Sequence, residues 1–349
     1  MVIVGIDTHK RTHTAVAIEA SGQKLDQITV PATTAGALTL LDWAARWAER
    51  RWAIEDCRHL SRRLEGDLLR AGESVVRVYP KLMAGARRIG REPGKSDPID
   101  ALAVARAALR EPDLPIARLD GPERDIRLLT DHRDDLVATR TAMENRLRWH
   151  LHELWPGQEP PARSLARASV LAAVDDLLAG SGSTGAGIAR ELVALIRTLT
   201  SAIERLEREI RALVAPLAPT LLLLEGCGWL GAAKLIGETA GITRFRSRAA
   251  YARHNGSAPV PVWSGNVVRH RLNRGGNRQI NLALHRIAIT QLRVGAEGRT
   301  YFEHRLAVGD TRTEALRALR RRISDEVYRR LRHDESRRAA SHEVADLAA

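Results

Sequence analysis

Four carboxylates in the first third of the chain combine the residue types and positions that metal-dependent phosphodiester chemistry requires. Asp7 and Glu55 each end a run that reads as a strand, and Asp97 and Asp100 lie three residues apart at the start of a predicted helix. Residues three apart share one face of a helix. Divalent cations such as Mg²⁺ take oxygen ligands, and a pair of them can clamp the attacking and leaving oxygens of a phosphodiester. We therefore predict a site for two Mg²⁺ ions at these four carboxylates.

Taken one at a time, the same carboxylates have simpler structural explanations. A helix cap, a strand end or a surface ion pair would account for any single one, and Asp56 could take the place of Glu55. Because all four occur together at strand ends and at one helix start, a shared metal site is favoured over four separate structural roles. Three nearby histidines, His9, His13 and His59, are predicted as surface residues, although His9 could reach the edge of the site.

An arginine-rich segment without acidic residues is the strongest binding signal in the chain. No Asp or Glu occurs between Glu238 and Glu297, whereas ten arginines do. A solvated surface normally mixes both signs of charge, and Phe245, Tyr251 and Trp263 add rings on which bases could stack. We predict nucleic-acid phosphate contacts from eight of these arginines: Arg244, Arg246, Arg248, Arg253, Arg269, Arg271, Arg274 and Arg278.

The overall composition agrees with a nucleic-acid partner without establishing it. Of 349 residues, 55 are Lys or Arg and 42 are Asp or Glu, which gives a net charge of +13. Nearly all the positive charge is arginine, whose planar fork binds phosphate bidentately. An excess of arginine and alanine also arises in GC-rich genomes without selection for binding. The positions of the arginines therefore count for more than their number.

Cysteine usage and hydrophobicity indicate a protein of the cytoplasm. Cys57 and Cys227 lie far apart and belong to no metal-binding spacing, so both are expected as reduced thiols. The start of the chain does not resemble a signal peptide, and no apolar stretch approaches the roughly 20 residues of a membrane span. We expect a cytoplasmic protein, associated with the nucleoid, and no membrane partner.

The elements that must position the carboxylates follow from the hydrophobic pattern. It predicts strands over 2–8, 13–19 and 25–31, a helix over 35–49, a strand ending at Glu55, a helix over 59–71 and a strand over 75–79. A basic loop over 81–94, with Arg87, Arg88 and Arg91, and a helix from about Ser96 follow. This order predicts an α/β fold in which a mixed sheet is flanked by helices and strand ends gather at one edge.

Long helices are predicted in the middle of the chain. One amphipathic helix extends from Pro122 to Leu154, and breaks follow at 156–157 and 180–183. The next helix has a heptad seam with isoleucine at a and leucine at d: Leu192, Ile196, Leu199, Ile203, Leu206, Ile210 and Leu213. This pattern favours a two-stranded coiled coil between copies of the chain, although the seam could also pack against the 122–154 helix.

The last third of the chain is predicted to be mostly helical. Gly226-Cys227-Gly228 lies between two helix-like segments, as in a helix-hairpin-helix whose turn binds phosphate through backbone amides, but a plain turn fits as well. A final helix is expected over 313–333, and residues 337–349 are expected to form a frayed, flexible tail.

Several of these motifs together resemble the one-ten insertion-sequence transposases. The N-terminal match is GIDTHK at 5–10, then Glu55, then KSDPIDA at 95–101; the C-terminal match is APVPVWSGN at 258–266 and RHRLNRGGNR at 269–278. The resemblance implies an N-terminal RuvC-like domain of the RNase H fold over 1–115 and a helical coiled-coil region over 116–218. It implies a mostly α C-terminal transposase domain over 219–336, ahead of the tail.

The family resemblance also implies an activity. Such proteins recombine DNA through a covalent serine-DNA intermediate, with the Asp-Glu-Asp-Asp set and its Mg²⁺ ions assisting, and a structured RNA from the element selects the DNA. By this match Ser264 is the nucleophile, and Ser257 is the alternative if the alignment shifts. The implied partners are DNA and a structured non-coding RNA, and the heptad seam adds further copies of the chain.

Three other interpretations remain open from the sequence. A RuvC-like endonuclease could use metal-activated water, with Ser264 only structural. An actin-like kinase fold could begin with Gly5-Ile6-Asp7-Thr8, although no second glycine-rich phosphate loop follows. A non-catalytic nucleic-acid-binding oligomer would need the arginines but not the four carboxylates.

Overall fold

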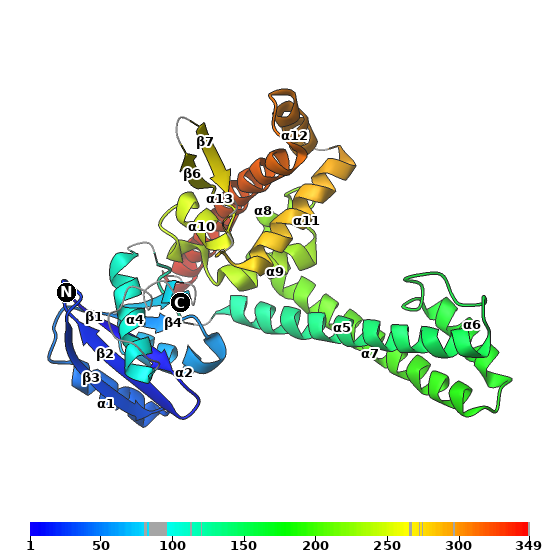
Figure 1. Ribbon diagram of the computed structural model, residues 1–349, viewed down its shortest axis with the longest axis horizontal. Helices are drawn as coiled ribbons and strands as arrows, with labels where there is room; N and C mark the ends of the chain where they lie inside the picture. The colour runs from blue at the N-terminus through cyan, green and yellow to red at the C-terminus, as the bar shows by residue number, and fades with distance from the viewer. Residues whose placement is uncertain are drawn as a thin grey trace.

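The computed structural model describes residues 1–79, 82–83, 96–111, 114–119, 121–264, 267–271, 273, 275–295 and 297–347. Its elements form three parts (Figure 1): an N-terminal sheet with helices, a projecting arm of long helices, and a helical C-terminal part with a two-stranded hairpin. The mixed α/β fold of the first part and the mostly helical remainder confirm the predicted fold class. The basic loop predicted over 81–94 lies outside the described residues, apart from 82 and 83.

The described N-terminal sheet has five strands in the order β3-β2-β1-β4-β5. These are β1 (Val2–Thr8), β2 (Thr12–Ile18), β3 (Lys24–Pro31), β4 (Arg50–Glu55) and β5 (Val75–Val78). β1 is antiparallel to β2 and parallel to β4, and β4 is parallel to β5. All five strands were predicted. The parallel pair β1 and β4 brings two predicted carboxylates to the same edge.

Helices cover both faces of this sheet. Alternate residues of β1 point to opposite faces, so each face carries apolar side chains that a helix can bury. The helices are α1 (Thr34–Ala44), α2 (Arg58–Arg70) and α4 (Asp97–Arg110). Val4 and Ile6 belong to the core formed with α1 and α2, whereas Ile3 belongs to the core formed with α4. Asp7 has the same parity as Ile3, so its side chain lies on the α4 face.

The first helix ends earlier than predicted. α1 stops at Ala44 rather than continuing to residue 49. The guanidinium of Arg50, at the start of β4, donates to the carbonyl oxygens of Ala44 (3.3 Å) and Trp47 (2.9 Å). These bonds satisfy backbone groups that the helix end leaves open, so the chain can turn into β4.

Gly5 sets the distance between β1 and α4. A Cβ atom built on Gly5 would lie 2.3 Å from the carbonyl oxygen of Ala101 and 2.4 Å from the amide nitrogen of Ala105. Both alanines are fully buried. Because the neighbouring atoms belong to backbone, they cannot move aside as a side chain could. The helix and the strand therefore touch only because position 5 is glycine.

Three helices form the arm in the middle of the chain (Figure 1): α5 (Pro122–Leu154), α6 (Ala168–Ala179) and α7 (Thr184–Leu217). α5 and α7 had been predicted, whereas α6 had not. Leu147 and Leu151 of α5, Leu171 and Leu178 of α6 and Ile196 of α7 are buried in one core. Five seam residues of α7, at 192, 196, 203, 206 and 210, are buried within this single chain.

The heptad seam therefore packs within the chain, which was the alternative to pairing between copies. α7 lies along α5, and Arg133 of α5 donates to Glu207 of α7 at 2.6 Å. With its seam covered, α7 no longer supplies an argument for self-association. The homo-oligomer, which was predicted from this seam, stays a prediction.

The described residues of the C-terminal part form nine elements: α8 (Pro219–Leu222), α9 (Trp229–Thr239), the 3-10 helix η1 (Ile242–Arg244), α10 (Arg248–Asn255), β6 (Val260–Ser264), β7 (Val267–Arg271), α11 (Arg278–Val294), α12 (Glu297–Ala307) and α13 (Arg312–Leu347). The turn at Gly226 packs closely on α11, because a Cβ there would lie 2.9 Å from the carbonyl oxygen of Ile287. α8 has only four residues. The turn thus serves close packing, and the described elements do not form a regular helix-hairpin-helix.

The last helix is longer than predicted. α13 extends to Leu347, so residues 337–347 continue the helix where a frayed tail had been expected. Arg338 of this segment lies 3.4 Å from a carboxylate oxygen of Glu123 at the start of α5. Contact with α5 therefore favours the helix beyond residue 333. Across the described ranges, no helix is both long and apolar enough to cross a membrane.

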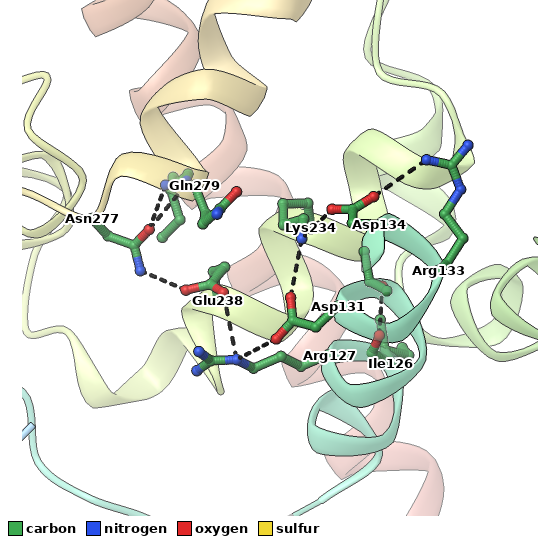
Figure 2. Close-up of polar contacts among 11 residues, drawn as sticks. Ile126, Arg127, Asp131, Arg133, Asp134, Lys234, Glu238, Asn277 and Gln279 are labelled. Atoms are coloured by element: carbon green, nitrogen blue, oxygen red, sulfur yellow. Dashed lines mark hydrogen bonds and ion pairs between the residues drawn. The ribbon is translucent and has the colours of Figure 1, made fainter. Parts of the chain in front are cut away.

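A polar network fastens the arm to the C-terminal part (Figure 2). Lys234 of α9 forms ion pairs with Asp131 (3.1 Å) and Asp134 (2.8 Å) of α5. Glu238, one turn further along α9, is buried and accepts a hydrogen bond from Asn277 Nδ2 at 2.6 Å. Asn277 in turn caps α11 through two backbone amides. The network holds α5, α9 and the start of α11 together.

We predict that Gly5→Ala destabilises the protein by about 1–3 kcal/mol, because the added methyl group would overlap the backbone of α4. The matched control is Gly187→Ala within α7, where a Cβ meets no atom within 4 Å. That variant should gain up to about 1 kcal/mol from helix propensity. Urea denaturation followed by circular dichroism measures both. Equal stability of the two variants would contradict the close approach.

Candidate active site

The edge of the sheet brings Asp7 and Glu55 together through strand register. β1 and β4 are parallel, and their last paired residues are Ile6 and Ile54. Asp7 and Glu55 are the next residues of the two strands, so they lie beside each other where the pairing ends. Glu55 alternates with Ala53, which belongs to the core beneath α4. Both carboxylates therefore lie at the carboxyl end of the strands, on the face that α4 covers.

The first turn of α4 supplies the other two predicted carboxylates. α4 begins at Asp97, and Asp97 and Asp100 both lie in its first turn. The side chain of Ser96, the N-cap residue, makes no capping hydrogen bond. Negative charge is favoured at a helix N-terminus, so this position tolerates two acids. Asp100 is buried, whereas the side chain of Asp97 is half-exposed.

His9 joins the acids of β1 and α4. Its Nε2 lies 3.0 Å from Asp7 Oδ2 and 3.3 Å from Asp97 Oδ1. One ligand atom from each of these three residues lies within 4.8 Å of the other two. The sequence predicted a surface histidine that could reach the edge of the site, and the half-exposed His9 is in direct contact with two of its acids. The signal for it is the Asp-x-His spacing, which places both side chains on one face of an extended chain.

The electrostatics of Asp7 reflect its burial among other acids. Asp7 is 4% exposed. Loss of hydration raises the pKa of its carboxyl group, His9 acts in the opposite direction, and the negative charges of Asp100 and Asp97 raise the pKa further. The folded chain therefore places an acid where its charged form is disfavoured. A bound cation would reverse that preference.

The donor set at this edge fits a divalent cation. Carboxylate oxygens from β1 and from α4 converge, and the only other described member of the cluster is His9. Mg²⁺ prefers oxygen ligands and is held by one or two protein carboxylates together with substrate phosphates. Asp7 and Asp97 meet that requirement. Asp100 lies in the same helical turn as Asp97, and Glu55 ends the strand next to that of Asp7. His9 would share the two carboxylates with an ion or yield them to it.

Cys57, near the same edge, is a partly buried thiol without the features of a metal ligand. Its Sγ lies 2.9 Å from the hydroxyl of Thr8. Burial raises the pKa of the thiol, and the neighbouring carboxylates of Glu55 and Asp56 add to that effect. Both cysteines of the chain are free, as predicted.

The predicted nucleophile lies at the end of a hairpin in the C-terminal part. Ser264 is the last residue of β6 and pairs with Val267 of β7. The side chain of Ser264 lies outside the described residues. The alternative, Ser257, has a hydroxyl oxygen buried from solvent and without a hydrogen-bond partner among the described residues. Burial of this oxygen makes Ser257 poorly placed to attack DNA.

Part of the predicted nucleic-acid surface is in fact core. Arg244 is 6% exposed, and its guanidinium lies 4.7 Å from the ring centre of Phe245 and 3.5 Å from His254 Nε2. Phe245 and Tyr251 are 2% and 0% exposed. The prediction that Arg244 binds phosphate, and that these two rings stack on bases, was therefore wrong. The segment before α10 is irregular, so its sequence has no periodic pattern from which the burial of these side chains could be predicted.

Four of the predicted arginines are exposed in the C-terminal part: Arg246, Arg248, Arg253 and Arg278. Arg253 also forms an ion pair with Glu111, at 3.0 Å, across the boundary with the N-terminal part. The side chains of Trp263, Arg269 and Arg271, and all of Arg274, lie outside the described residues.

A buried contact joins the N-terminal and C-terminal parts beside these arginines. The hydroxyl of Tyr79, just after β5, hydrogen-bonds Nδ1 of His254 in α10. Burial, with the nearby charges of Arg244 and Arg77, holds the pKa of His254 well below its usual value. The imidazole is therefore neutral at physiological pH and acts as a packed, hydrogen-bonded core residue.

Two family models match the chain, one at each end. The IS110 DEDD model, described as a transposase, matches residues 4–156, and the model of the IS116/IS110/IS902 transposase family matches residues 218–303. The fold and its acidic edge, together with these matches, define a transposase. The chain belongs to the IS116/IS110/IS902 family of insertion elements, which confirms the resemblance drawn from the motifs.

Relatives of similar length accompany these matches. The chain is 27% identical, over 376 residues, to a 44.8 kDa protein of insertion element IS116 from Streptomyces clavuligerus, covering 94% of each chain. It is 26% identical, over 381 residues, to a 42 kDa protein of IS900 from Mycobacterium paratuberculosis, covering 95% and 96%. Among solved structures, T. thermophilus RuvC in complex with a Holliday junction substrate is similar with 16% identity and a TM-score of 0.28, covering 34% of this chain and 99% of that one.

We predict that Asp7→Asn raises the free energy of unfolding at neutral pH in excess chelator, because burial disfavours the charged carboxylate. A raised pKa lowers stability where the carboxylate is ionised. The advantage of the variant should therefore shrink as the pH falls through the ordinary carboxyl range. Denaturant titrations at several pH values measure it, with exposed Asp42→Asn as the control. A less stable Asp7→Asn at neutral pH would refute this.

Proposed function

We propose that this transposase cuts and rejoins DNA through a covalent bond between Ser264 and DNA, assisted by a magnesium site at Asp7, Glu55, Asp97 and Asp100. The observation that carries the proposal is the meeting of Asp7 and Asp97 around His9, although ninety residues separate these acids in sequence. Such convergence between a central strand and a helix start is what a phosphoryl-transfer site with metal ions needs.

Each acidic residue would contribute to metal or substrate binding according to its position and burial. Asp7 is held by the rigid central strand, and Asp100 is buried in the first turn of α4. Asp97 is half-exposed and lies where a substrate phosphate can approach. His9 hydrogen-bonds Asp7, lies 3.3 Å from Asp97, and orients both carboxylates. Two Mg²⁺ ions would supply positive charge to the scissile phosphate.

The covalent step exchanges one phosphate ester for another. The hydroxyl oxygen of Ser264 forms a bond to phosphorus, the bond to a deoxyribose oxygen breaks, and the serine proton is transferred overall to that departing oxygen. A second attack, by a deoxyribose hydroxyl, reverses the exchange on a new strand end and releases the serine. No oxidant or external energy source is required, because the number of ester bonds is conserved.

The two sets of residues lie apart in one chain. The β6–β7 hairpin projects from the C-terminal part, away from the strands of the sheet (Figure 1). We propose that they combine by movement of the two parts or across copies of the chain. The exposed arginines of the C-terminal part would hold the DNA backbone, and an RNA from the element would select the DNA, as the family resemblance implies.

The same separation favours a second candidate function, an endonuclease in which the acidic site activates water and Ser264 is structural. Both functions need the four carboxylates. They differ in whether DNA becomes attached to the protein, so the serine can be tested independently of the metal site.

We predict that Asp97→Asn lowers recombination on the order of a thousandfold, because it removes a carboxylate from the metal site without removing volume. The assay is recombination of a plasmid that carries the gene with its native flanking DNA. Asp42→Asn makes the same chemical change on an exposed face of α1 and should leave the rate unchanged. Full activity of Asp97→Asn with an unchanged fold would exclude the acidic site.

We predict that Ser264→Ala abolishes a protein-DNA adduct while DNA binding persists, because the alanine removes only the nucleophilic oxygen. Denaturing electrophoresis with labelled DNA detects the adduct. Ser257→Ala is the matched control and should keep the adduct, since its hydroxyl is buried. An adduct that survives Ser264→Ala would transfer the role to another residue. Cleavage without any adduct would support the water-based endonuclease.

A further inference from the structure

A basic hollow lies between α11, α13 and the end of α10, on the C-terminal part. Its lining includes Asn255 and Gly256 from the end of α10, Arg278, Asn281 and His285 from α11, and Arg320 from α13. Its volume of about 490 Å³ is sufficient for a phosphate with its attached sugars. We propose that this hollow seats a backbone phosphate of DNA, with Arg320 as its principal cation.

Arg320 is partly buried and lacks a described counter-charge. Its Nη1 donates to Asn281 Oδ1 at 3.0 Å, while Nε is buried and has no hydrogen-bond partner among the described residues. No carboxylate in the described part of the chain lies within ion-pair distance of it. Burial and the like charge of Arg317 lower the pKa of Arg320. A bound anion would supply the counter-charge that Arg320 lacks among the described residues.

His285 adds a second polar atom that lacks a partner. Its Nδ1 is buried and makes no hydrogen bond within the described residues. Burial and the charge of Arg320 lower the pKa of His285, which keeps its ring neutral at physiological pH. A neutral imidazole can donate one N–H to a phosphate oxygen. His285 and Arg320 both line the hollow, so an anion there would lie beside both side chains.

The hollow is held in shape by hydrogen bonds and close packing. Asn281, which holds Arg320, donates through Nδ2 to the carbonyl oxygen of Asn255 at 3.0 Å. Asn255 donates to Ser324 Oγ of α13 at 2.7 Å. A Cβ on Gly276 would lie 2.2 Å from the amide nitrogen of Gly256, so the two loops meet backbone to backbone. Arg320 is thus positioned before a ligand arrives.

The surrounding charge selects an anion of nucleic acid. α11 and the segment before it contain no acidic residue, and exposed Arg278 lies at the rim. Arg320 itself lies outside the arginine-rich segment, so the hollow links that segment to α13. The assignment to DNA rests on the proposed function. Binding of the phosphate group is separable from catalysis, because it needs no metal site.

The test compares DNA binding by the full chain and its variants in excess EDTA. Anisotropy of a short labelled duplex over a salt series should give about tenfold weaker binding for Arg320→Gln, with a salt slope lower by about one. Arg320→Lys should recover part of the loss, since the charge remains. His285→Phe, which obstructs the hollow and leaves Arg320 in place, should also weaken binding. Thermal unfolding checks that each variant folds.

The control is Arg332→Gln, an exposed arginine on the same helix, which should change affinity by less than about twofold. Equal losses for Arg320→Gln and Arg332→Gln, or no loss for either, would overturn the pocket while leaving the proposed function intact. A loss seen only with single-stranded RNA, or NMR shifts of His285 caused by inorganic phosphate but not by DNA, would overturn the assignment to DNA. Unmodified protein that binds no DNA would overturn both proposals.

Discussion

The contact between β1 and α4 is the constraint on which the acidic edge depends. Because Gly5 has no side chain, the backbone of α4 rests directly on the central strand beside Ala101 and Ala105. That contact fixes where the first turn of α4 lies, and so places Asp97 within reach of His9 and Asp7. A larger residue at position 5 would lift the helix and separate the acids, even if every carboxylate were retained. The site is thus a consequence of backbone packing.

The strand ends were predictable from sequence because apolar runs stop where the acids begin. Asp7 and Glu55 follow buried segments whose burial is confirmed, and the helix from Asp97 begins where it was expected. The role of His9 was harder to see, since it depends on a residue ninety positions away. Arg244 and Arg246 are alike in sequence, yet one is buried and the other exposed, because a short irregular segment has no periodicity to reveal its faces. Which helix would cover the seam of α7 likewise depended on tertiary packing.

Partly buried charged groups in this chain are compensated by opposite charges at some sites and lack a described counter-charge at others. At the acidic edge, Asp7 and Asp97 converge and fit a cation; in the C-terminal hollow, Arg320 lacks a described counter-charge, and we propose that an anion supplies it. Elsewhere opposite charges compensate within the protein, as Lys234 does with Asp131 and Asp134. Charged groups that lack such compensation within the described residues are the ones suited to bind a ligand. The buried joint of Tyr79 and His254 connects the two parts that carry these sites.

The central claim is that the four carboxylates form one ion site, and counting bound ions tests it most directly. Mn²⁺ can replace Mg²⁺ and is visible by electron paramagnetic resonance, so the full chain can be titrated without any DNA or activity assay. We predict two tightly bound ions per chain and the loss of at least one when Asp7→Asn and Glu55→Gln are combined. The same number of ions, bound with the same affinity, in the unmodified protein and in the double variant would contradict it.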